Sequence, residues 1–210
     1  MELLRLGFPT SLQMFFEVSG FAGAALLMGI ISKDAQAAHQ IAINMSAVTF
    51  LICSGLGMAA TVRVGNRLGE KNAPGLRRAG LSSIIQVIMI MFVFAMIMVT
   101  FRHVLPAFYI DDQNVISIAA TLLIAAAVFQ IPDGVQVVAL GALRGLQDVK
   151  IPTFITFVAY WIFGLPISYI SAFHFDFGPL GIWLGLVVGL IVSSSLLTLR
   201  FRAKSKVFIT

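Results

Sequence analysis

The sequence predicts an all-α membrane protein whose six transmembrane helices form one bundle. Hydrophobic residues make up 59% of the 210 residues and charged residues only 11%, a balance well outside that of soluble domains. Several apolar runs exceed the roughly 18 residues needed to cross a bilayer core about 30 Å thick. The basic residues gather in alternate connections between these runs. Together these observations predict a single multi-pass unit over residues 1–210.

The expected spans follow one another with short connections. At about 1.5 Å per residue each helix reaches about 30 Å or more, which is enough to cross the bilayer with some tilt. Cys53 is the single cysteine, so the chain can form no internal disulfide and offers no metal cluster. The spans are placed roughly at residues 7–31, 35–62, 80–101, 115–143, 151–173 and 178–199.

The distribution of Lys and Arg predicts the orientation. With the N-terminus in the cytoplasm, twelve basic residues fall on the inside and only Lys33 and Arg102 on the outside, as the positive-inside rule requires. We therefore expect a cell-membrane protein with both termini cytoplasmic, in the inner membrane if the source is Gram-negative. This distribution explains the basic charge balance without a nucleic-acid partner. The inside set is Arg5, Arg63, Arg67, Lys71, Arg77, Arg78, Arg144, Lys150, Arg200, Arg202, Lys204 and Lys206.

The segment 63–80, "RVGNRLGEKNAPGLRRAG", is expected to be the largest cytoplasmic connection. Its glycines could suggest a loop that cradles phosphate groups. The segment lacks both the GKS/T ending and the preceding strand of such a loop. We therefore interpret it as a solvated loop that sets the topology.

Two carboxylates inside the apolar spans are the strongest functional candidates. Glu17 lies near the middle of "SLQMFFEVSGFAGAALLMGII", with Gln13 four residues earlier on the same helical face. Asp133 lies in "VFQIPDGVQVV", beside Pro132 and between Gln130 and Gln136. A charged side chain facing lipid at mid-bilayer costs roughly 2.5–3.5 kcal/mol, so such residues face a protein interior or a wet cavity.

The proline next to Asp133 predicts a hinge in the fourth span. Pro132 removes a backbone donor and frees a carbonyl one turn earlier, and transporters build cation sites from carboxylates beside such breaks. The two carboxylates could therefore hold and release a proton or a small cation. The alternative is that each is protonated and serves as a hydrogen bond between helices.

Gln40 and Asn44, in "AAHQIAINMSAV", are spaced by four residues on the second span and share one helical face. They could join helices by hydrogen bonds or line a substrate cavity, and the sequence leaves both interpretations open. Gln13, Phe129, Gln130 and Gln136 are further candidates for the cavity wall.

The motifs occur in an order that resembles the C-terminal half of a MATE (multidrug and toxic compound extrusion) transporter of the NorM-like branch. The resemblance runs through all six spans. It implies a twelve-helix transporter of two lobes that exports amphiphilic, often cationic, compounds in exchange for Na⁺ or H⁺. The motifs are "GFPTSLQMFFE", "AAHQIAIN", "ATVRVGNRLGEKN", "FQIPDGVQVV", "GALRGLQDVKIP", "YWIFGLPISY" and "GPLGIWLG".

The resemblance also implies roles for individual residues. The family's cation site corresponds to Glu17 and Asp133, and its polar cavity positions correspond to Gln40 and Asn44. NorM-like members often carry a tyrosine where this chain has Phe129, so one possible Na⁺ ligand is missing. We expect no organic cofactor and no metal beyond possible Na⁺ at the carboxylates. The first lobe is absent, so the chain is expected to be a fragment or a half that pairs with another lobe.

Three other functions compete with antiport. A MATE-like lipid-linked saccharide flippase would need more cationic residues in its cavity than these spans contain. A structural or channel-forming bundle remains open, and ion conductance without substrate would support a channel. An enzyme is not expected, because the chain has neither a nucleophile pair nor a metal signature such as HExxH.

Overall fold

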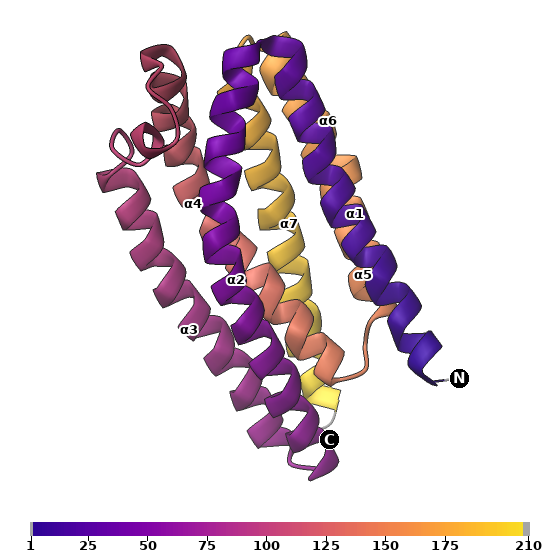
Figure 1. The fold of residues 1–210 in the computed structure, drawn as a ribbon. Coiled ribbons are helices and arrows are strands. Elements are labelled where there is room, and N and C mark those ends of the chain that lie inside the picture. Colours follow the sequence, from indigo (N-terminus) through magenta and orange to yellow (C-terminus); the bar gives the residue numbers. More distant parts are fainter. Residues whose placement is uncertain (1, 208–210) are drawn as a thin grey trace.

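The computed structural model describes residues 2–207 and contains the six predicted spans as helices long and apolar enough to cross a membrane (Figure 1). The fold class is therefore confirmed. Five spans are uninterrupted helices: α1 (Glu2–Ile31), α2 (Lys33–Gly69), α3 (Ala73–Thr100), α4 (Gln113–Gly145) and α7 (Gly178–Val207). The remaining span is assembled from α5 (Lys150–Phe157), η2 (Val158–Gly164), α6 (Leu165–Tyr169) and η3 (Ile170–His174), and a short 3₁₀ turn, η1 (Pro106–Phe108), precedes α4.

The prediction of a long cytoplasmic loop over residues 63–80 is wrong. The three residues 70–72 are all that separate α2 from α3, and the basic residues on either side are helical. A single glycine costs a helix only about 1 kcal/mol, so the glycines of this segment do not end α2. The turn comes where Asn72 caps α3, its Oδ1 accepting the Gly75 amide at 2.9 Å, with Pro74 in the first helical turn.

The span from Lys150 to His174 changes its helical register twice. Its segments η2 and η3 are π-helical, so that their backbone hydrogen bonds join residues five apart instead of the four of an α-helix. The wider turns rotate the side chains that follow relative to a regular helix. Between them, the Ser168 hydroxyl donates a hydrogen bond of 2.9 Å to the Ile182 carbonyl of α7.

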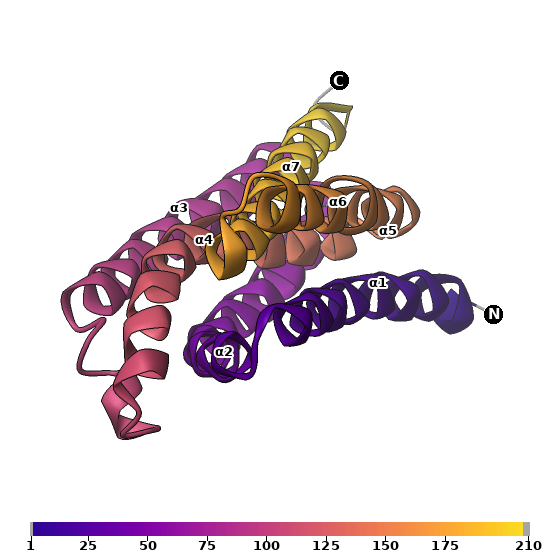
Figure 2. The ribbon, with the colours of Figure 1, turned by 90° about the horizontal axis from the view of Figure 1, so that it is seen from above.

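The centre of the bundle is formed by α4 and α7, which carry the largest buried share of their apolar stretches (Figure 2). Helix α4 continues through Pro132 without interruption, so the predicted break is not a gap in the helix. At Gly141, a side chain would collide with the Gly57 backbone of α2, and the Thr61 hydroxyl donates to the Gly141 carbonyl at 2.8 Å. Small residues thus let the backbones of α2 and α4 approach closely.

The ends of the helices form two groups. The N-terminus, the α2–α3 turn, the α4–α5 connection and the C-terminus lie at one end of the bundle, and the α1–α2 and α6–α7 connections lie at the other (Figure 1). At the first end, the Arg200 guanidinium of α7 forms a bidentate salt bridge with the Asp148 carboxylate, with N–O distances of 2.7 and 3.1 Å. The alternation deduced from the charges therefore agrees with the path of the chain.

Candidate functional site

A pocket of about 280 Å³ lies between α1, α2 and α4 and brings Glu17 and Asp133 together. Ser46 is the third polar residue in its wall, and none of the ten lining residues is basic. The other seven are apolar, three of them phenylalanines. The lining residues are Met14, Glu17, Val18, Phe21, Ile43, Ser46, Ala47, Phe50, Phe129 and Asp133.

Helical spacing explains why these side chains meet. The α1 residues recur three or four positions apart, from Met14 through Glu17 to Phe21. The same interval separates Phe129 from Asp133 on α4. Residues spaced in this way lie on one face of a helix, so each of the three helices presents one stripe to the pocket. Asp133 is 5% exposed and Glu17 is half-buried.

Gln136 connects Glu17 to a second span. Its side-chain amide donates one hydrogen bond to Glu17 Oε1 at 3.3 Å and another to the Tyr160 hydroxyl at 3.1 Å. An amide NH₂ has two hydrogens, so both bonds can form together. Because the Gln136 side chain is fully buried, this amide is a fixed link between α1, α4 and η2.

Tyr160 is the functional candidate that the sequence analysis missed. Its ring is 1% exposed and packs against Phe21, with centroids 5.7 Å apart. Gly20 leaves room for this ring, since a Cβ at that position would lie 3.0 Å from Tyr160 Cδ1. The Tyr160 hydroxyl is thus connected to Glu17 through the Gln136 amide. It supplies a phenol group near the carboxylate, which Phe129 cannot do. The motif "YWIFGLPISY" contained the residue but could not indicate where its side chain points, because η2 is π-helical.

The other predicted α1 and α4 residues occupy different positions. Phe129 lines the pocket, whereas Gln13 is buried and is not among the lining residues. The Gln13 side-chain oxygen accepts a hydrogen bond from Arg144 Nη2 at 3.2 Å. Gln130 lies outside the pocket, because its amide is directed to Met98 Sδ of α3 at 2.9 Å. Arg144, assigned only to topology from the sequence, therefore also joins α4 to α1.

Gln40 and Asn44 lie outside the pocket on an exposed part of α2. Gln40 Nε2 donates to Asn44 Oδ1 at 3.2 Å, so their hydrogen bond stays within one helix. The pocket residue Ala47 is three positions beyond Asn44, which puts all three residues on one stripe of α2. The polar pair therefore continues the pocket wall toward the Lys33 end of the helix.

The oxygen atoms in the pocket suit a hard cation or a proton. The carboxylates of Glu17 and Asp133 and the Ser46 hydroxyl are the donor groups available there. Within residues 2–207, no three His, Cys, Asp or Glu side chains come together as a transition-metal site would require. The donor set is thus compatible with Na⁺ or H⁺.

The family model MatE matches residues 9–170 of the chain. The chain belongs to the MATE family. A probable multidrug resistance protein NorM from Mesorhizobium japonicum is 42% identical, over 98% of this chain and 45% of its own length. The multidrug resistance protein NorM of Photobacterium profundum is 39% identical, over 96% of this chain and 45% of its own. The NorM-like resemblance deduced from the motifs is therefore confirmed.

The crystal structure of the eukaryotic MATE transporter AtDTX14 has the same fold. It superposes on 99% of this chain with a TM-score of 0.89 at 24% identity, and the match covers 48% of that chain. The chain thus spans about half the length of the curated MATE relatives and of the solved structure that it matches. MATE proteins are transporters, which agrees with the expectation that the chain is not an enzyme.

Proposed function

We propose that this chain is the C-terminal lobe of a MATE antiporter that exports amphiphilic, often cationic, compounds in exchange for Na⁺ or H⁺. The observation that carries the proposal is the pocket whose mostly apolar wall includes both Glu17 and Asp133, which come from different spans. Pockets of this kind, apolar with a few converging polar groups, are typical of ligand sites. The names of the NorM relatives refer to multidrug resistance, which supports drugs as the exported compounds.

The size of the pocket supports a second lobe as partner. At about 280 Å³ it lies just below the range of roughly 300–1,000 Å³ usual for drug-sized ligands. It has room for a cation and part of a substrate. Gln40 and Asn44 are exposed on α2, where a polar pair facing lipid would be unfavourable. A second lobe opposite them would close a larger cavity, of which this chain supplies one wall.

The coupling mechanism follows from having two carboxylates in one pocket with mostly apolar walls. When Glu17 and Asp133 are both charged, they repel each other, and a Na⁺ ion or a proton relieves the repulsion. Uptake and release of the cation would then favour different conformations of the lobe, and the ion gradient would bias the cycle. The phenylalanines of the wall offer ring faces to a cationic substrate. The absence of basic lining residues favours this substrate over the pyrophosphate of a lipid-linked saccharide.

The test replaces each carboxylate by its amide in the reconstituted transporter. Glu17→Gln keeps the shape and hydrogen bonding of the side chain but fixes it as neutral, so we expect export to collapse while insertion and heat stability are retained. Asp133→Asn should do the same, and the double variant should be little worse than either, since residues acting as a unit are non-additive. Asp111→Asn, a carboxylate change in the exposed α3–α4 connection, is the matched control. Intact export by Glu17→Gln would show that the glutamate only joins helices.

We propose further that the end of the bundle carrying both termini is cytoplasmic. The support is the twelve-to-two distribution of basic residues, together with the end of the bundle shared by the termini, the α2–α3 turn and the α4–α5 connection (Figure 1). Gln113 and Gln147 are exposed residues of opposite ends. In intact cells, an impermeant thiol reagent should label a cysteine at Gln113 but not one at Gln147. Labelling at Gln147 would reverse the orientation.

A further inference from the structure

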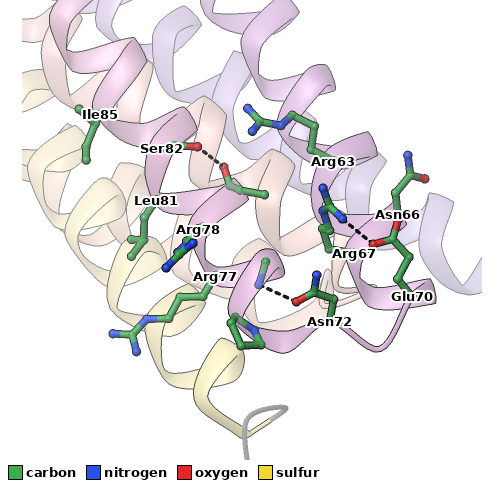
Figure 3. A pocket seen from close by; sticks show the side chains of 13 residues that line it. Arg63, Asn66, Arg67, Glu70, Asn72, Arg77, Arg78, Leu81, Ser82 and Ile85 are labelled. Atoms are coloured by element: carbon green, nitrogen blue, oxygen red, sulfur yellow. Dashed lines mark hydrogen bonds and ion pairs between the residues drawn. The ribbon is translucent and has the colours of Figure 1, made fainter.

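A second pocket, of about 1000 Å³, lies at the α2–α3 turn and plays no part in the proposed transport mechanism (Figure 3). Two helices contribute arginines to it: Arg63 and Arg67 come from α2, and Arg77 and Arg78 from α3. Glu70 is the single carboxylate in its wall. The pocket is thus strongly cationic, although topology alone requires only a sufficient number of basic residues and not four of them in the wall of one pocket.

Most of this positive charge is free to meet an anion. Arg67 is paired with Glu70 at 2.6 Å, on an exposed part of the surface. The other ion pair within residues 2–207 joins Arg200 to Asp148, so no carboxylate of the described chain pairs with the remaining three pocket arginines. These guanidinium groups have planar arrays of donors that match phosphate oxygens.

The wall of the pocket changes from cationic to apolar along α3. Arg78, Ser82 and Ile85 are spaced by four and three residues and lie on one helical face. Seven residues correspond to about 10 Å along a helix axis, so Ile85 lies about that far from Arg78 toward the apolar part of α3. Ile85 is 57% exposed, and Leu81 lines the pocket between Arg78 and Ile85 along the helix. A ligand that fills this pocket meets charge at one end and an open apolar surface at the other.

We propose that this pocket binds the headgroup phosphate of an anionic phospholipid, whose acyl chains run along α3 past Ile85. Basic pockets between transmembrane helices suit anionic headgroups, which combine a phosphate with a hydrocarbon tail in the same order as the wall of this pocket. A free phosphate would use the arginines but not Leu81 and Ile85. The lipid would hold α2 and α3 together at the turn, since each helix supplies two arginines.

Native mass spectrometry of the purified transporter in detergent, titrated with phosphatidylglycerol, tests the proposal. We expect Arg77→Gln/Arg78→Gln to raise the dissociation constant about tenfold or more. Glu70→Gln should act in the opposite direction and tighten binding about twofold, because it releases Arg67. Arg77→Lys/Arg78→Lys, which keeps the charge but loses the guanidinium geometry, should fall between wild type and the glutamine pair.

The matched control is Arg202→Gln/Lys204→Gln, which removes two exposed charges from the C-terminal end of α7 at the same end of the bundle. It should change the dissociation constant by less than about twofold if the site is specific. Equal weakening by both double variants would overturn the proposal, as would equal binding of phosphatidylcholine. Soluble glycerol phosphate tests whether a free anion is sufficient. If it binds as tightly as the lipid, the proposal is also overturned. If Arg77→Gln/Arg78→Gln fails to insert, Arg63→Gln removes a charge from α2 instead, and unchanged lipid binding by that variant refutes the site.

Discussion

Replacing Tyr160 by phenylalanine isolates one oxygen atom in the hydrogen-bond network of Glu17. The Tyr160 ring is buried against Phe21, and phenylalanine keeps that packing. The change removes the hydroxyl that accepts a hydrogen bond from the Gln136 amide at 3.1 Å. One buried hydrogen bond contributes about 0.5–1.5 kcal/mol to stability, so the free energy of unfolding should fall by about 1 kcal/mol.

The effect on transport follows from the second bond of the same amide. In the variant, Gln136 is held only by its contact of 3.3 Å with Glu17, so Glu17 loses part of the support that fixes its position. If the lost hydrogen bond destabilises the cation-bound form by about 1 kcal/mol, the ion concentration that gives half the maximal export rate should rise about fivefold. The maximal rate should change much less, because Glu17 and Asp133 are both retained.

The assay is export by the reconstituted transporter, measured against Na⁺ concentration and against pH, together with thermal unfolding of the same preparation. Tyr169→Phe is the matched control, because Tyr169 is 57% exposed and should affect neither quantity. The reasoning is refuted if Tyr160→Phe lowers stability while the half-maximal ion concentration stays the same. In that case the hydroxyl supports packing only, and Gln136 does not position Glu17.

Three further changes test other parts of the structure. Pro132→Ala restores a backbone donor inside α4, so we expect slower export with little loss of substrate binding; an unchanged rate would exclude a hinge. Gly141→Leu should destabilise the protein by about 3 kcal/mol or more in thermal unfolding because it forces α4 away from the α2 backbone, whereas Gly55→Leu, which points into open space, should have little effect. Arg200→Gln leaves the mostly buried Asp148 unpaired and should cost about 2 kcal/mol of unfolding free energy; equal stability would show that water replaces the guanidinium.

The sequence alone determined the fold class, the six spans and the two carboxylates as candidates. Hydrocarbon requires long apolar helices with satisfied backbones, so span number and approximate boundaries can be deduced from composition and length. Glu17 and Asp133 stand out because an acid in such a helix is unfavourable without a polar or wet partner. The family resemblance was also available from ordered motifs. None of these deductions depends on how the helices are rotated about their axes.

The tertiary structure decided which side chains meet. It directed Gln130 to α3 and away from the pocket, and it brought Tyr160 to Gln136 through a π-helical turn that local sequence does not reveal. It also turned the expected loop 63–80 into two helix ends whose arginines line one pocket. The physical reason is that a polar side chain near a helix face is placed by the rotation and register of that helix. Close packing against neighbouring spans fixes both, through contacts between residues far apart in the chain.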